Sequence, residues 1–152
     1  MTVSRRYAPV LLSMWRDPDF RTLTVGAQRL YIVLLSDPRR SMVGAVPYTP
    51  RAWAATCATT TAEDIDGWLD ELTDRRYVIV DTRTDELLIR TVVKHDPPAG
   101  PKQVVAMWRA WERIESEHLR RAVLAEIGAD TWLLDPMSRP AAVDAMRGRG
   151  ND

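Results

Sequence analysis

The sequence predicts a mainly α-helical fold with a small β hairpin, an α+β arrangement in which helices dominate. Apolar residues recur at steps of three and four through most of the chain, which is typical of amphipathic helices. Two short apolar runs, 77–80 and 87–93, are separated by a polar turn and indicate the hairpin. Four Pro and Gly residues within 97–101 interrupt both patterns, so they divide the chain.

The first helix is expected over 24–36, with the hydroxyl of Thr24 as its cap. The pair Asp37-Pro38 ends it, because proline cannot continue a helix. The segment 45–47 then has the apolar character of a short edge strand. One helix and one strand are therefore predicted before residue 48.

Two further helices follow in quick succession. Thr49-Pro50 pairs a capping residue with proline at the first helical position, which predicts a helix over 50–57. Thr61, with Asp64 at the capping-box position, predicts the next helix over 62–74. A turn of about three residues separates the two, which is the spacing of a helix-turn-helix.

The hairpin completes a recognisable order of elements. Its polar loop, 81–86, carries Arg83 at the centre, and its apolar faces can pack on Trp68 and Leu72. Helix, short strand, two helices and two strands is the order of a winged helix, in which the hairpin is the wing. The sequence therefore predicts a winged helix-turn-helix followed by a helical C-terminal extension.

Four regions result from these boundaries. The winged helix is expected over 1–96, and 97–101 is a Pro-rich hinge. A helical extension is expected over 102–135, as one bent helix or two with the break near Ser116. The remainder, 136–152, offers little apolar surface to bury and is expected to be loose. The first region is expected to fold by itself.

The zero net charge hides an uneven distribution. Residues 1–58 hold eight Arg against three Asp, a net of +5, whereas residues 59–96 hold five basic and ten acidic side chains, a net of −5. Residues 97–152 balance at eight against eight. A chain of this kind can meet a polyanion through one face only.

Composition argues against several classes of protein. Cys57 is the single cysteine, so no internal disulfide is expected, and no Cys/His group has the spacing of a zinc site. His95 and His118 stand in no catalytic spacing, and there is no phosphate-binding Gly-rich loop. We expect no catalytic residues, no metal and no cofactor. The lack of disulfides favours a reducing cytoplasm as the location. The longest apolar run, Leu30 to Leu35, is far shorter than the roughly twenty residues of a membrane span, so no membrane span is expected.

Five short motifs occur in order along the chain: Trp15-x-Asp17-Pro-Asp-Phe20, Leu23-x3-Ala27-Gln28-x-Leu30-Tyr31, Thr49-Pro50-Arg51-x-Trp53-Ala54, Trp68-Leu69-x2-Leu72 and Glu86-Leu-Leu-Ile-Arg90. Together they resemble a known family, the winged-helix proteins of actinobacterial phages and prophages. The resemblance covers about residues 13–125. It implies a helix-turn-helix DNA-binding protein, related to phage replication initiators and replisome organisers, in a bacterial host cell.

Seven residues are candidates for contact with double-stranded DNA. Arg39, Arg40 and Arg51 flank the second helix and Arg83 tips the wing, where guanidinium groups can bind phosphate. The turn Thr59–Thr61 and the free N–H groups after it can donate to phosphate or base oxygens; the alternative is that these threonines only cap the helix. The third helix presents only acidic charges and would face DNA at a cost: Glu63, Asp64, Asp66, Asp70, Glu71 and Asp74.

The C-terminal extension has an apolar face that a lone helix cannot bury. We expect this face to mediate self-association, with a homodimer as the simplest product. Packing back on the chain's own first region is the alternative. The residues concerned are Val104, Met107, Trp108, Trp111 and Ile114.

Two functions follow from these features. The first is duplex DNA binding in replication initiation or transcriptional regulation. The second is a protein-interaction winged helix that docks its acidic third helix on a host or phage replication or transcription protein. The acidic third helix favours the second function, and the basic excess before residue 59 favours the first.

Overall fold

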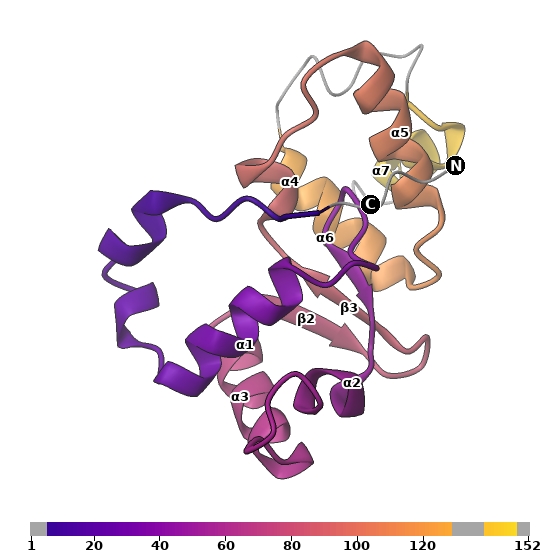
Figure 1. Cartoon of the computed structure of the whole chain (residues 1–152). Coiled ribbons are helices and arrows are strands. Elements are labelled where there is room, and N and C mark those ends of the chain that lie inside the picture. Colours follow the sequence, from indigo (N-terminus) through magenta and orange to yellow (C-terminus); the bar gives the residue numbers. More distant parts are fainter. Residues whose placement is uncertain (1–5, 129–138, 149–152) are drawn as a thin grey trace.

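The structure, a computed structural model, describes residues 6–128 and 139–148. A small sheet lies between two sets of helices (Figure 1). On one side lie α1 (Val25–Leu35), α2 (Pro50–Ala54) and α3 (Ala62–Asp74). On the other side lie α4 (Val92–His95), α5 (Pro101–Glu112), α6 (Glu117–Ile127) and α7 (Ala141–Gly148).

The N-terminal segment loops out beside α1 and is drawn in indigo in Figure 1. It contains two short 3₁₀ helices, η1 (Leu12–Arg16) and η2 (Phe20–Thr22). The sequence patterns gave no indication of these two turns. Within residues 6–128 and 139–148, none of the helices combines the length and the apolar character that a membrane crossing requires.

The first and third predicted helices are confirmed almost to the residue. The Thr24 hydroxyl accepts a hydrogen bond from the Ala27 N–H at 3.3 Å and caps α1. The Thr61 hydroxyl accepts from the Asp64 N–H at 3.1 Å, and the Asp64 carboxylate accepts from the Thr61 N–H at 2.8 Å. This reciprocal capping box satisfies two backbone donors that the first turn of a helix leaves open.

The second helix is shorter than predicted. It ends at Ala54 instead of continuing to residue 57. The Thr56 hydroxyl donates to the Trp53 carbonyl at 2.6 Å, and the Thr56 N–H bonds the same carbonyl at 3.2 Å. Side-chain bonding of this kind competes with the helical ladder and tightens the chain into turns.

The sheet has three antiparallel strands in the order β1-β3-β2, which are β1 (Ala45–Pro47), β2 (Val78–Asp81) and β3 (Glu86–Ile89). The predicted run 87–93 is wrong beyond Ile89, where the chain turns into α4. Neither neighbouring strand of the sheet continues past this point. Ile89 pairs with the first residue of β2, and its N–H bonds the Gly44 carbonyl just before β1 begins.

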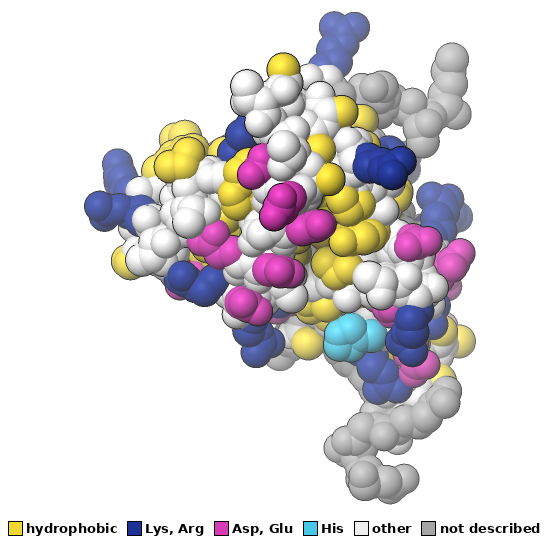
Figure 2. All heavy atoms as spheres, turned by 90° about the horizontal axis from the view of Figure 1, so that it is seen from below, with side chains coloured by type: hydrophobic (Ala, Val, Ile, Leu, Met, Phe, Trp, Pro, Cys, Tyr) yellow, Lys and Arg dark blue, Asp and Glu magenta, His cyan; other side chains and the backbone are white. Residues whose placement is uncertain are grey.

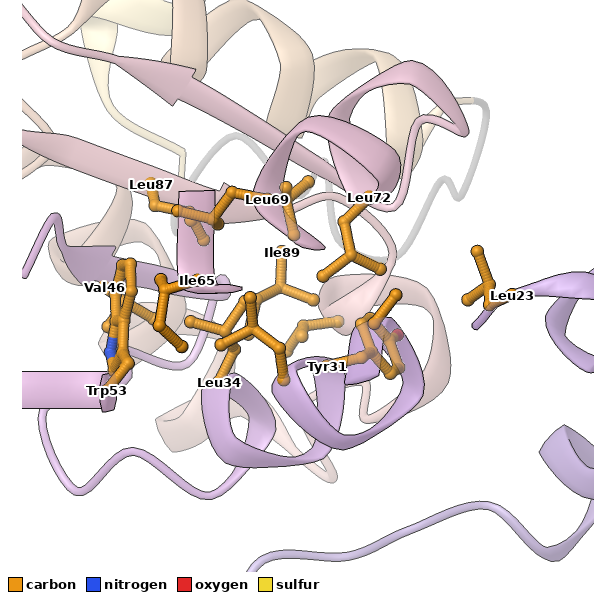
Figure 3. Close-up of a cluster of buried hydrophobic side chains, with 14 of the residues drawn as sticks. Leu23, Tyr31, Leu34, Val46, Trp53, Ile65, Leu69, Leu72, Leu87 and Ile89 are labelled. Carbon is orange, nitrogen blue, oxygen red and sulfur yellow. The ribbon is translucent and has the colours of Figure 1, made fainter. Parts of the chain in front are cut away.

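The first core lies between the sheet and helices α1, α2 and α3 (Figure 3). Leu87 and Ile89 point into it, whereas Leu88 between them belongs to the core on the opposite face, as the two-residue period of a strand requires. Trp53 is fully buried here, as expected from the sequence. Trp68 was expected in the core too but is only half-buried, and its ring lies so close to Gly26 that a Cβ there would be 2.0 Å from it.

The second core occupies the opposite face of the sheet. Val43, Leu88 and Val93 meet α5, α6 and Val143 of α7 there. The five residues expected to mediate self-association are all buried in this core, at 0 to 3% exposure: Val104, Met107, Trp108, Trp111 and Ile114. In this fold these five side chains are therefore not exposed for self-association. The alternative, packing back on the chain's own first region, is what removes their apolar surface from water.

Two boundaries in the C-terminal part differ from the prediction, and one agrees. Pro101 is the first residue of α5 rather than the last of the connection, a position that proline favours because it needs no N–H there. The tail 136–152 was expected to be loose, yet its described part forms α7, because Val143 is fully buried in the second core. The predicted break at Ser116 is confirmed, and its hydroxyl caps α6.

Polar contacts join the C-terminal helices to the hairpin. The Ser116 hydroxyl donates to the Asp81 carboxylate at 2.7 Å, and the Glu86 carboxylate accepts from the N–H groups of Glu115 and Ser116 at 3.1 and 2.8 Å. Arg90 forms an ion pair with Glu126. Because one sheet supplies a face to each core, residues 1–96 share a core with the extension.

Candidate nucleic-acid interface

Two arginines lie at the start of α2, and a third, Arg83, lies in the loop between β2 and β3. The Tyr48 N–H bonds the Asp85 carbonyl at 2.8 Å, which holds the hairpin loop beside the residues that precede α2. Arg39 donates to the Thr49 hydroxyl at 2.7 Å. Arg51 follows in the first turn of α2 and is exposed. We call Arg39, Arg51 and Arg83 the basic edge.

A repeated Asp-x-Arg turn positions two of these arginines. The Asp37 carboxylate accepts from the Arg39 N–H at 2.9 Å, and the Asp81 carboxylate accepts from the Arg83 N–H at 3.0 Å. Both aspartates are buried, and each has one more donor: the Trp53 indole at 3.1 Å for Asp37, the Ser116 hydroxyl for Asp81. The Asp-x-Arg spacing is visible in the sequence, but the shared turn is visible only in the structure.

The two turns leave their arginines in different states. Arg39 forms a close bidentate pair with Asp37, at 2.7 and 3.0 Å, and its side chain is 41% exposed. Arg83 reaches Asp81 only at 3.4 Å, and its side chain is 83% exposed. Arg83 therefore presents most of its guanidinium to solvent, whereas Asp37 partly neutralises Arg39.

The pKa values of both aspartates are lowered. Burial raises the pKa of Asp37, but hydrogen bonds from Arg39 and Trp53 outweigh it and leave the pKa below its usual value. The Ser116 hydroxyl, with Arg83, lowers the pKa of Asp81 to about 2. Both carboxylates are thus anionic at neutral pH and can anchor the turns that carry the arginines.

Arg40 does not belong to this surface, contrary to the prediction. Its side chain is 4% exposed, and its Nε donates to the Leu35 carbonyl at 2.9 Å. Its guanidinium also lies 3.9 Å from the Asp96 carboxylate. The chain turns after Asp37-Pro38 so that Arg39 faces outward and Arg40 inward, and sequence adjacency cannot distinguish the two.

Residues of the predicted turn Thr59–Thr61 make hydrogen bonds within the chain itself. Thr61 and Asp64 bond each other in the capping box, and the Thr59 hydroxyl lies 3.3 Å from the Cys57 sulfur. These contacts match the capping alternative. The Asp64 carboxylate at the helix start also occupies the place where an anion would bind. Hydrogen bonds from Thr59 and Thr60 lower the pKa of Cys57 to about 7, a feature that the sequence did not indicate.

One face of α3 carries four exposed acids that have no hydrogen bond or ion pair within the described part of the chain: Glu63, Asp66, Asp70 and Asp74. We call these four the acidic face. Figure 2 shows acidic side chains gathered in a row on this side of the molecule. Glu71 is different, because its carboxylate accepts from the Thr24 N–H and hydroxyl at 2.8 and 2.6 Å.

Tyr48 marks the border between the two surfaces. Burial raises its pKa, and the negative charges of Asp66 and Asp70 raise it further, so these acids lie near it. Its backbone N–H is bonded to the Asp85 carbonyl of the β2–β3 loop, which also carries Arg83. Tyr48 therefore lies near both the β2–β3 loop and the acids of α3, and α3 itself has no basic residue in its last turn.

Comparison with known proteins finds no matching family model, no similar curated protein and no similar solved structure. Across residues 6–128 and 139–148, no three His, Cys, Asp or Glu side chains gather in a group that could hold a metal ion. The geometry and charge of the surfaces described above are therefore the basis for inferring a function.

Proposed function

We propose that this chain is a winged-helix DNA-binding protein that contacts duplex DNA through its basic edge. The order α1-β1-α2-α3-β2-β3, with the sheet order β1-β3-β2, supports a winged helix whose wing is the β2–β3 hairpin. In such proteins the wing and the flanking loops bind phosphate. The resemblance to phage winged-helix proteins favours a role in replication initiation or transcriptional regulation.

The exposed guanidinium of Arg83, anchored by a buried aspartate, is the observation that carries the proposal. The Asp81 turn fixes the backbone of Arg83 while leaving its side chain in solvent, which is the state that a phosphate contact needs. Arg51 adds an exposed charge on the neighbouring α2, and Arg39 adds a partly neutralised one.

The acidic face limits the orientation in which the protein can bind DNA. Placing four carboxylates without partners against phosphates would cost free energy, and this cost rises as salt is lowered. We infer that DNA lies along α2 and the wing, with the body of α3 turned away from the major groove. Thr59 and Thr60, at the turn before α3, remain the candidates for base contact in this mode.

Fluorescence anisotropy with a labelled mixed-sequence duplex tests the proposal. We expect the double variant Arg51→Glu/Arg83→Glu to weaken binding by about a hundredfold at low salt, since two phosphate contacts become repulsive. The matched control is Arg109→Glu/Arg113→Glu, which changes the same charge at two exposed positions of the C-terminal extension. Equal loss in both double variants would show a nonspecific effect of net charge and refute the basic edge.

The acidic face supports a second candidate function, docking on a basic protein of the replication or transcription machinery. Four unpartnered acids on one helix face can pair with a lysine- or arginine-rich surface. The double variant Asp66→Lys/Asp70→Lys distinguishes the two candidate functions. This change should strengthen DNA binding if DNA passes near α3, and it should abolish a protein contact made by the acidic face.

A further inference from the structure

The N-terminal segment, residues 9–22, is anchored to the body of the protein but loops out beside α1 (Figure 1). The Asp19 carboxylate accepts from Arg75 and from the Tyr77 hydroxyl, and Phe20 is buried in the first core. A cavity of about 420 Å³ lies between the segment, α1 and α4. Because these contacts hold η1 and η2 in place, the outer side of the segment presents a defined surface.

The outer side of this segment is apolar. Leu12 is 85% exposed and Trp15 is 51% exposed, and neither residue lines the cavity. Val25, the first residue of α1, is 81% exposed. Among the residues that the structure describes, every large hydrophobic residue that is exposed lies within 7–25. Exposed apolar side chains that gather in one region mark a surface for interaction with another molecule.

Two arginines accompany these apolar side chains. Arg16 and Arg21 are exposed, and their guanidinium groups have no hydrogen bond or ion pair among residues 6–128 and 139–148. Of the two aspartates beside them, Asp19 is paired with Arg75, and Asp17 accepts from the Asp19 N–H at 2.9 Å. Two guanidinium groups thus remain against one carboxylate, and the segment has a positive excess.

The acidic face of α3 lies beside this segment. Arg75, just after α3, bonds Asp19 of the segment, and Glu71 of α3 accepts from Thr24, which follows the segment. Figure 2 shows basic and hydrophobic side chains at the left, where the segment lies, and the row of acidic side chains next to them. Neither the arginines of the segment nor the four acids find a partner within the described part of one copy, although the two sets are neighbours.

We propose that this side of the molecule binds a second copy of the chain, and that a two-fold axis places each N-terminal segment on the acidic face of the other copy. A surface with a positive strip beside a negative strip becomes self-complementary after a two-fold rotation. The contact removes Leu12, Trp15 and Val25 from water, and it brings Arg16 and Arg21 to the acids of α3. The inference is independent of the DNA contact proposed above, because it uses no arginine of the basic edge.

Sedimentation velocity of the full chain without DNA tests the dimer. We expect a dissociation constant on the order of 10 μM at low salt, and a dimer at least about tenfold weaker at high salt, because salt screens exposed charges. Leu12→Asp should weaken the dimer by at least about tenfold, since it places an unpaired charge in the apolar contact. The matched control is Ala106→Asp, which adds the same charge at an exposed position of α5, with the melting temperature as the check on folding.

Exchanging the charges tests which surfaces meet. Arg16→Glu/Arg21→Glu makes the segment acidic, and Asp66→Lys/Asp70→Lys makes the face of α3 basic, so each variant alone should be a monomer. Mixing the two should restore the dimer, because both contacts between the variants then join opposite charges. The label is carried only by the lysine variant, so that its sedimentation reports the mixed dimer alone.

The control for the exchange mixes the labelled lysine variant with Arg109→Glu/Arg113→Glu, which has the same net charge as the segment variant. We expect less mixed dimer here, since only one of the two contacts joins opposite charges. Equal amounts of mixed dimer in the two mixtures would show attraction by net charge and overturn the proposal. A chain that stays monomeric at about 100 μM and low salt overturns it as well, and so does a dimer that none of these variants weakens.

Discussion

The basic edge and the acidic face lie on either side of Tyr48 and carry opposite charges, yet they differ more in how their charges are held. Arg39 and Arg83 follow buried aspartates that fix their backbone, with Arg83 reaching into solvent. The acids of α3 merely follow the solvent side of an amphipathic helix whose apolar side, Ile65, Leu69 and Leu72, is buried. The fold thus holds Arg39 and Arg83 in place, whereas exposed acids without partners are also what solvation of an amphipathic helix produces.

Both surfaces depend on one sheet, so the largest expected effect comes from removing the second core. A fragment of residues 1–96 exposes Val43, Leu88 and Val93, which the C-terminal helices now cover. We expect it to lack a cooperative thermal transition, because burial of each such side chain contributes about 1.5–3 kcal/mol. Circular dichroism melting of the fragment and the full chain measures this. A cooperative transition in the fragment would restore the independent domain that the sequence suggested.

Asp81 connects the basic edge to the C-terminal helices, and its protonation should weaken this connection. Its pKa of about 2 lies below the unfolded value of about 3.9. The stabilisation is therefore present above the unfolded pKa and is lost as pH falls from about 5 through 2. Asp81→Asn should flatten the acid limb of the stability curve in urea titrations. Asp81→Asn with an unchanged acid limb would contradict the anchoring role.

The cap of α3 offers a smaller change that separates folding from binding. Thr61→Ala removes the hydroxyl that accepts from the Asp64 N–H, and it should cost about 0.5–2 kcal/mol of stability. DNA affinity at a temperature well below the transition should stay the same, because this hydroxyl is already used within the chain. If affinity or base preference fell with the stability unchanged, Thr61 would be a DNA contact.

The smallest effect is expected on the acidic face. Asp66→Asn/Asp70→Asn removes two negative charges at exposed positions, so DNA affinity should stay equal or rise by at most about threefold at low salt. Anisotropy titrations beside Asp144→Asn, an acid of α7 that is ion-paired to Arg139, control for the loss of a negative charge away from α3. A loss of affinity in the α3 double variant alone would mean that these acids face the partner.

Local signals predicted much of the first half of the fold. Thr24, Thr61 with Asp64, and the polar loop around Arg83 identify the ends of elements, because caps and turns depend on neighbours in sequence. The place where Trp108 and Trp111 are buried could not be predicted in this way. An apolar helix face predicts that another part of a protein covers it. Only the structure shows that the covering surface is the face of β3 that carries Leu88.

The candidate site could likewise be predicted only in part from the sequence. Arg51 and Arg83 are exposed as expected, but Arg40 is buried, because the turn after Asp37 points adjacent residues in opposite directions. The cavity beneath the N-terminal segment was not predicted at all. Its walls come from residues far apart in the chain, so no spacing in the sequence brings them together.

The salt dependence of DNA binding tests the central claim most directly. For a phosphate contact, Arg83→Ala should weaken binding to all sequences alike and reduce the slope of log affinity against log salt by about one. Asp66→Asn/Asp70→Asn should leave that slope unchanged. If the aspartate variant abolished binding while Arg83→Ala and Arg51→Ala changed neither affinity nor slope, the acidic face would be the contact surface, and docking on a basic protein would replace DNA binding.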